Sequence, residues 1–238
     1  MDELLVALDV DTIDQARALA DELRGAVGGF KIGSRLFTSH GPAFVEALAS
    51  RGDRVFLDLK FHDIPNTVAG AVAAATRLGV WMVNVHASGG LTMLRAAREA
   101  ADTEASRLSR PAPLIIAVTM LTSMSESTLG EIGMSGPMTA QVERLARLTQ
   151  SAGLDGVVAS PQETSLIRAC CGPRFTIVTP GIRAAADSKG DQTRTSTAAE
   201  ALSAGASYLV VGRPIIGAAR PRRAAEEIGA ACRATNAT

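Results

Sequence analysis

A regular alternation of apolar segments and helix-forming segments most constrains the fold of this chain of 238 residues. Several of the apolar segments are nearly continuous runs, which is typical of parallel strands buried on both faces. The eight predicted strands cover residues 4–8, 29–33, 54–60, 80–86, 114–119, 155–160, 175–179 and 207–212. Eight strand–helix units in a chain of this length predict a (β/α)8 TIM barrel, an α/β fold that commonly takes about 250 residues.

Helix signals lie between the predicted strands. Thr12 can cap a first helix, and Pro65 suits the first turn of another, where its missing N–H costs nothing. The other predicted helices cover residues 42–50, 89–101, 137–152, 162–170, 198–204 and 222–233. A doubly wound open sheet is the alternative, but Asp9-Val10-Asp11 stands where that fold places a glycine-rich turn. We therefore expect residues 1–238 to form a single barrel domain.

Composition excludes several classes of partner. Lys plus Arg equals Asp plus Glu at 24 each, so net charge gives no reason to expect nucleic acid or an acidic membrane surface. No apolar run is long enough to span a bilayer, and the acidic start Met1-Asp2-Glu3 does not resemble a signal peptide. Three cysteines, two of them adjacent, do not form a disulfide framework. We expect reduced thiols and a cytoplasmic location.

Charged residues collect at the predicted carboxyl ends of the first three strands. Asp9 ends the first strand, Lys31 lies on the second, and Asp58 and Lys60 lie on one face of the third. Active sites of such barrels form at this end, so we expect the four side chains to meet there. Neighbouring carboxylates favour the charged form of Lys60. A cationic lysine can donate a proton and can also stabilise a developing carbanion.

Other strand ends supply further candidates. Asp63 follows the third strand, Asn84 and His86 end the fourth, and Thr122 and Ser123 follow the fifth. Since these barrels often bind phosphate after strands seven and eight, Gly212 and Arg213 are expected to form a phosphate site. The polar residues 181–194 form either a closing loop over an anion or an ordinary solvated loop; their candidate anion-binding side chains are Arg183, Lys189, Gln192 and Arg194.

A metal site is a competing interpretation of the same cluster. Asp58, Asp63 and either His62 or His86 could supply ligands, but Lys31 and Lys60 would repel a divalent ion. We expect no metal and no cofactor. For His86 we expect a structural role.

The stretch from Asp58 to Thr67, DLKFHDIPNT, resembles the signature of the orotidine 5′-phosphate decarboxylase family. Segments along the whole chain resemble that family in the same order: Ala7-Leu8-Asp9, Phe30-Lys31-Ile32-Gly33, Val85-His86-Ala87-Ser88-Gly89-Gly90, Leu121-Thr122-Ser123, Pro180-Gly181-Ile182-Arg183, Gly190-Asp191-Gln192 and Val211-Gly212-Arg213-Pro214. Two small departures are Thr193 and Ile216, where the family often has a basic residue and a threonine.

The resemblance implies cofactor-free decarboxylation of orotidine monophosphate to uridine monophosphate by a homodimer with shared active sites. It implies that Lys60 protonates C6 of the pyrimidine, beside Asp58, and that Asp9 and Lys31 hold the ribose. The residues expected to reach the neighbouring subunit's substrate are Asp63, Ile64 and Thr67. The residues expected to face the pyrimidine are Thr122 and Ser123, and those expected to bind the phosphate are Arg183, Gln192, Gly212 and Arg213.

Two alternatives remain open. The core Asp58-x-Lys60-x-x-Asp63 is shared with metal-dependent sugar-phosphate enzymes, including hexulose-phosphate synthases and keto-gulonate-phosphate decarboxylases. Those relatives resemble one another in placing an acidic metal ligand on strand two, where this chain has Lys31. A catalytically inactive barrel that binds a ligand is the other alternative, although none of the four charges of the expected network is missing.

Overall fold

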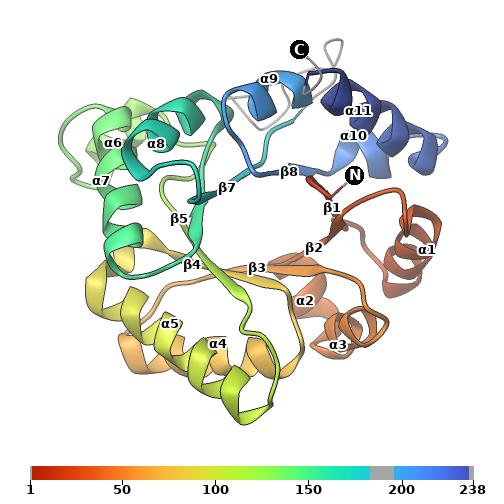
Figure 1. The fold of residues 1–238 in the computed structure, drawn as a ribbon, viewed down its shortest axis with the longest axis horizontal. Helices are drawn as coiled ribbons and strands as arrows, with labels where there is room; N and C mark the ends of the chain where they lie inside the picture. The colour runs from red at the N-terminus through yellow and green to blue at the C-terminus, as the bar shows by residue number, and fades with distance from the viewer. Residues whose placement is uncertain (1, 183–195, 236–238) are drawn as a thin grey trace.

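The structure is a computed structural model that describes residues 2–182 and 196–235. Within these ranges, eight parallel strands close into one barrel in sequence order, with helices around the outside (Figure 1). The strands are β1 (Leu4–Ala7), β2 (Gly29–Gly33), β3 (Val55–Phe61), β4 (Met82–His86), β5 (Leu114–Val118), β6 (Gly156–Val158), β7 (Thr176–Thr179) and β8 (Tyr208–Val211). The predicted (β/α)8 barrel is thus confirmed.

The helices alternate with the strands along the chain. They are α1 (Ile13–Leu23), α2 (Ser34–His40), α3 (Ala43–Ser50), α4 (Pro65–Arg77), α5 (Gly90–Arg107), α6 (Glu126–Glu131), α7 (Met138–Ser151), α8 (Thr164–Cys171), α9 (Ala198–Ser203), α10 (Arg213–Ile216) and α11 (Pro221–Thr235), with short 3-10 turns η1 (Ala87–Gly89) and η2 (Pro161–Glu163). Thr12 caps α1 through a capping box with Gln15, and Pro65 occupies the first turn of α4, both as predicted.

Helix α2 is absent from the sequence-based prediction. It follows β2 directly, its N-cap is Gly33 without a side-chain hydrogen bond, and Leu36 is its one fully buried side chain. A helix that buries so little apolar surface leaves no 3.6-residue periodicity to detect. Helix α5 also continues six residues beyond the predicted end at residue 101, to Arg107.

Side chains alternate along each strand between the barrel interior and the surrounding helices. The interior cluster consists of Leu5, Ala7, Phe56, Met82, Ile116, Val178 and Val210. Intervening residues such as Val6, Leu57 and Val83 join the larger core that the helices share. The parity of a strand position therefore decides whether its side chain enters the barrel.

Aromatic side chains fill the amino-terminal end of the barrel. The ring of Trp81, just before β4, meets the ring of Tyr208 edge-on, with centroids 5.1 Å apart, and both pack against the interior cluster. The guanidinium of Arg54 lies 5.3 Å from the Trp81 ring centroid, a cation–π contact. With this end filled by packed rings, the polar interior positions lie at the carboxyl end.

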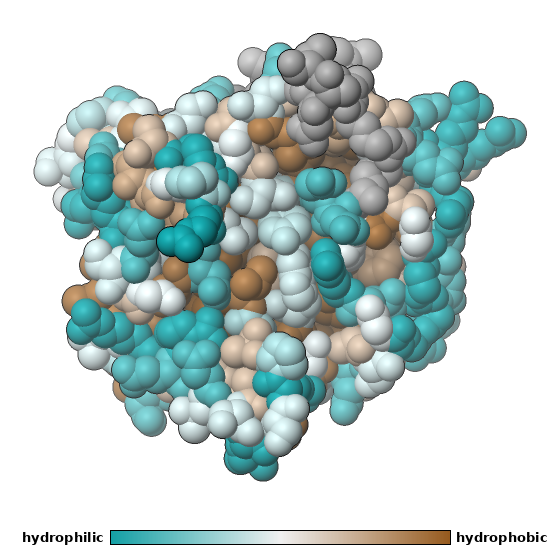
Figure 2. Space-filling view, in the orientation of Figure 1, coloured by the Kyte–Doolittle hydropathy of each residue, from teal (hydrophilic) through white to brown (hydrophobic). Residues whose placement is uncertain are grey.

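Hydrophilic residues predominate around the periphery of the face seen in Figure 2, and apolar residues show between them nearer its middle. No helix within residues 2–182 and 196–235 has both the length and the apolar character needed to cross a membrane.

Candidate active site

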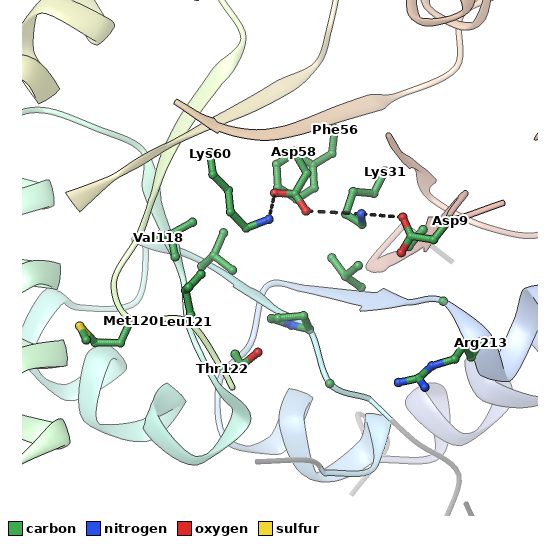
Figure 3. A pocket seen from close by; sticks show the side chains of 16 residues that line it. Asp9, Lys31, Phe56, Asp58, Lys60, Val118, Met120, Leu121, Thr122 and Arg213 are labelled. Atoms are coloured by element: carbon green, nitrogen blue, oxygen red, sulfur yellow. Dashed lines mark hydrogen bonds and ion pairs between the residues drawn. The ribbon is translucent and has the colours of Figure 1, made fainter. Parts of the chain in front are cut away.

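Four charged side chains form a row across the carboxyl ends of β1, β2 and β3 (Figure 3). The Lys60 ammonium lies 2.6 Å from Asp58 Oδ1, and the other carboxylate oxygen, Oδ2, lies 3.4 Å from Lys31 Nζ. Lys31 Nζ in turn lies 3.2 Å from Asp9 Oδ1. The structure therefore brings together the four charges expected to meet, in the alternating order base, acid, base, acid.

Strand parity places this row inside the barrel. Asp58 and Lys60 continue the interior positions of β3 that begin with Phe56, and Lys31 is the inward residue of β2 between Phe30 and Ile32. Lys31 is only 8% exposed, and burial of an unpaired ammonium would be costly. A Cβ at Gly33 would lie 3.1 Å from Lys31 Nζ, so glycine at this position leaves room for the ammonium between two carboxylates.

The row forms one side of a cavity of about 260 Å³, close to the lower limit of small-molecule sites. The residues lining this cavity are Ala7, Asp9, Lys31, Phe56, Asp58, Lys60, Val118, Met120, Leu121, Thr122, Val158, Pro180, Gly181, Val210, Gly212 and Arg213. Leu121, Thr122 and Arg213 lie across the cavity from the charged row (Figure 3). The site thus combines one charged side with a largely apolar base.

The Lys60 backbone is in the left-handed region, with φ of 53°. For a residue with a side chain this conformation costs about 1–2 kcal/mol. Leu57 and Phe61 are four residues apart, whereas their partners Val83 and Val85 in β4 are two apart, so β3 carries two extra residues here. This bulge turns the Lys60 side chain toward Asp58, and bulges of this kind often re-aim a side chain next to an active site.

Asn84 of β4 supports the bulge from inside the barrel. Its Oδ1 accepts a hydrogen bond of 2.8 Å from the Lys60 backbone N–H, and its Nδ2 donates one of 2.7 Å to Asp58 Oδ1. The sequence places Asn84 at a strand end but does not assign it a role. The available signal is its position between Val83 and Val85, which marks it as a polar residue on the inward face.

Asp58 is held as a carboxylate. Burial by itself raises the pKa of this side chain, but the charges of Lys31 and Lys60 and the hydrogen bonds from Lys60 and Asn84 together lower the pKa below its usual value. Only 12% of the Asp58 side chain is exposed, so solvent screens this charge poorly. A negative charge therefore persists deep in the cavity beside the Lys60 ammonium.

Two histidines flank the row. The rings of His62 and His86 lie 5.3 Å apart, centroid to centroid. Burial, the neighbouring His62 and the Lys60 charge lower the pKa of His86, against a smaller opposite effect of Asp58. Among the described residues, no group of three or more His, Cys, Asp or Glu side chains is arranged to hold a metal ion.

The remaining predicted residues fall into three groups. Thr122, Gly212 and Arg213 line the cavity, and Arg213 begins the short helix α10 after β8. Four others are exposed and do not belong to the cavity lining: Ser123, Asp63, Thr67 and Ile64, of which Ile64 is 66% exposed. Arg183 and Gln192, like most of the expected closing loop, lie outside the described residues.

The chain is similar to known proteins over almost its whole length. The sequence model of the orotidine 5′-phosphate decarboxylase / HUMPS family matches residues 2–228. Orotidine 5′-phosphate decarboxylase from Moorella thermoacetica is 55% identical over 230 residues, covering 96% of this chain and 91% of the relative. The enzyme of that name from Alkalilimnicola ehrlichii is 53% identical over 218 residues, covering 92% and 91%.

A solved structure shares both fold and sequence. The crystal structure of orotidine 5′-phosphate decarboxylase from Lactobacillus acidophilus superposes with a TM-score of 0.86 at 36% identity, covering 98% of this chain and 99% of that one. The match extends over the whole barrel, including the strands that carry the charged row. This chain therefore belongs to the orotidine 5′-phosphate decarboxylase / HUMPS family.

Proposed function

We propose that this protein decarboxylates orotidine 5′-monophosphate to uridine 5′-monophosphate, the last step of de novo pyrimidine synthesis, without a metal or another cofactor. The observation that carries the proposal is the row Lys60–Asp58–Lys31–Asp9 at the barrel mouth, with the Lys60 ammonium bound directly to a buried carboxylate. Relatives more than 50% identical over most of the chain bear the name of this activity.

The chemistry needs a proton donor beside a carbon that gains negative charge. In the proposed reaction the bond between C6 and its carboxyl carbon breaks, carbon dioxide leaves, and the electron pair stays on C6. Lys60 Nζ then gives a proton to C6, and its partly exposed side chain can recover a proton from water. The ammonium is in place before reaction, so it stabilises the developing carbanion without reorganisation.

Asp58 has two roles in this proposal. Its lowered pKa keeps it ionised, so the carboxylate holds the Lys60 side chain in position. It also faces the space beside Lys60 where the substrate carboxylate would lie, and the approach of two negative charges would favour loss of carbon dioxide.

The other lining residues suit the rest of the nucleotide. We assign ribose hydroxyls to Asp9 and Lys31, the pyrimidine to Thr122, and the phosphate to Gly212 and Arg213 across the cavity. Ser123, which follows Thr122 outside the cavity lining, is also proposed to face the pyrimidine. Arg183 and Gln192 are proposed to complete the phosphate site. Since phosphate is remote from C6, its binding energy would serve to close and assemble the site.

We also propose that the protein acts as a homodimer in which each subunit completes the other's site. Asp63, Ile64 and Thr67 follow the catalytic strand but are exposed, and Ile64 is 66% exposed in the single subunit. A second copy would cover this surface and bring the three residues to a substrate. Its free thiols agree with action in the cytoplasm.

The proposal is tested by following ultraviolet absorbance after orotidine 5′-monophosphate is added to protein treated with a chelator. We expect complete conversion to uridine 5′-monophosphate. A parallel assay with a hexulose phosphate and a divalent metal tests the metal-dependent sugar-phosphate activity that the sequence leaves open as an alternative. Metal-dependent turnover of the sugar phosphate, with no loss of absorbance from the nucleotide, would refute the proposal.

A further inference from the structure

Asn84 lies where β3 and β4 stop pairing regularly. It is 0% exposed, and it sits between Val83 and Val85, the two β4 residues that pair on either side of the bulge. Within the bulge the Lys60 N–H is bound by the Asn84 side chain rather than by a strand carbonyl. The amide thus takes a place that main-chain pairing fills elsewhere in the barrel.

The two groups that Asn84 contacts have opposite hydrogen-bonding needs. A backbone N–H can only donate, and an ionised carboxylate can only accept. The Lys60 N–H therefore requires the amide oxygen, and Asp58 requires the amide nitrogen, as the contacts show. Aspartate at this position would set a second carboxylate against Asp58. Leucine would remove the acceptor of the Lys60 N–H and one of the donors to Asp58, which would keep its contacts with Lys60 and Lys31.

Asp58 Oδ1 receives the Asn84 amide at 2.7 Å and the Lys60 ammonium at 2.6 Å. Asn84 consequently fixes the carboxylate that anchors the ammonium and also the strained backbone from which that side chain extends. We infer that Asn84 is a positioning residue for the reaction, which sets where the Lys60 ammonium lies relative to C6. This inference rests on the proposed function and deepens it.

The experiment compares Asn84→Leu, Asn84→Asp and a control, Thr179→Val, which alters a buried polar residue of β7 outside the cavity lining. Decarboxylation by the parent protein is measured first, because its absence would refute the proposed function. We expect Asn84→Leu to bind uridine 5′-monophosphate within about threefold of the parent but to lose about 100-fold in kcat, as small misplacements of catalytic groups do. Thr179→Val should retain the parent kcat.

Asn84→Asp adds a pH readout that a merely structural role would not produce. The charged groups around position 84 are Asp58, Lys60 and Lys31, with the His62–His86 pair nearby. Two adjacent carboxylates share a proton more readily as pH falls, and a protonated Asp at position 84 can again donate to Asp58. The ratio of variant kcat to parent kcat should therefore rise toward acidic pH.

Several results would overturn the inference. These are a kcat of Asn84→Leu within threefold of the parent, a loss confined to KM, or a pH profile of Asn84→Asp parallel to that of the parent. If Asn84→Leu does not fold, the pH profile of the nearly isosteric Asn84→Asp tests the inference instead. If the parent has no activity, a crystal structure of either variant tests whether Asn84 positions Lys60. An unchanged Lys60 φ and an unchanged Lys60–Asp58 contact would refute that positioning role.

Discussion

At the scale of single residues, Lys60 has an unfavourable backbone conformation but a favourable side-chain contact. Its φ of 53° is unfavourable, yet its ammonium reaches a buried carboxylate at 2.6 Å. Strained residues persist where the surrounding structure over-determines them, and they cluster at active sites. In this protein the bulge, Asn84 and Asp58 together impose the conformation.

The first prediction separates the strain at Lys60 from its chemistry. Lys60→Ala and Lys60→Gly should both lose at least about 100-fold in kcat, because the proton donor is gone. The glycine variant should be more stable than the alanine variant by about 1 kcal/mol, since glycine has no Cβ penalty at positive φ. Urea unfolding and the absorbance assay measure the two effects.

Ser109 provides the matched control for that comparison. In the described ranges it is the other non-glycine residue with positive φ, at 51°, and it lies after α5, away from the cavity lining. Ser109→Gly should likewise be more stable than Ser109→Ala, with parent activity in both. Equal stability of the two Lys60 variants would contradict a left-handed residue 60, and turnover within a few-fold of the parent would exclude the proton-donor role.

The second prediction concerns His86 and pH. Burial, His62 and Lys60 lower its pKa in the folded protein below the unfolded value of about 6.5, so the folded state binds this proton less readily. The contribution of His86 to stability is therefore fully present above pH of about 6.5 and is lost as pH falls toward the folded pKa. One such proton changes the unfolding free energy by up to about 1.4 kcal/mol per pH unit.

Urea unfolding between pH 5 and 7.5 tests this dependence. His86→Asn should flatten the decline of stability on the acidic side relative to the parent. His40→Asn, at an exposed surface position, should retain the parental decline. Identical slopes for parent and His86→Asn would show that His86 binds its proton equally well in the folded and unfolded states.

At the scale of elements, strand parity explains why much of the site is predictable. Residues 9, 31, 58 and 60 are inward positions at the carboxyl ends of neighbouring strands, so their meeting follows once the barrel is recognised. The Lys60 conformation and the Asn84 contacts depend on the two extra residues in β3, which no periodicity in the sequence reveals. Helix α2 escaped prediction because it buries little apolar surface.

The third prediction concerns Arg168 of α8, whose side chain makes hydrogen bonds to the segments that precede β7 and β8. Its guanidinium donates to the carbonyls of Gly172 and Phe175 before β7, and to the carbonyl of Gly205 before β8, at 2.6–2.8 Å. Arg168→Met should lower the unfolding free energy by about 2–3 kcal/mol, because partly buried carbonyls lose their donors. Arg223→Met, which removes an exposed ion pair with Glu227, is the control and should have little effect.

Both variants are measured by urea unfolding, with kcat as a second readout. Because Arg168 lies outside the cavity lining, Arg168→Met should keep its kcat while folded. Equal stability of the two variants would show that water replaces the guanidinium at these carbonyls without cost.

At the scale of the whole molecule, the two ends of the barrel differ: one end is packed with apolar and aromatic side chains, and the other carries the charged residues of the site. The amino-terminal end is filled by Trp81 and Tyr208, and the carboxyl end replaces apolar filling with the charged row. The segment from Asp58 to Thr67 then leaves the cavity: Asp58 and Lys60, at the end of β3, line it, whereas Asp63 and Thr67, beyond β3, are exposed. One continuous segment can therefore serve two sites only if a second subunit covers its exposed half.

The fourth prediction tests this division by mixing two inactive chains. Lys60→Ala lacks the proton donor and Asp63→Ala lacks the residue proposed to reach the partner's substrate. In an equal mixture with free exchange, half of the dimers are hybrids, and one of the two sites in each hybrid has both native residues. Activity should therefore return to about one quarter of the parent's, given a symmetric dimer.

Different affinity tags on the two chains allow the hybrid to be purified and its composition verified. The purified hybrid should reach about half of the parent activity per dimer, since one of its two equivalent sites is intact. As a control, a hybrid of Lys60→Ala with Asp58→Ala should stay inactive, because both substitutions remove groups that serve the same subunit's cavity. A pure Lys60→Ala/Asp63→Ala hybrid without activity would show that Asp63 serves its own subunit, and the shared-site dimer would have to be abandoned.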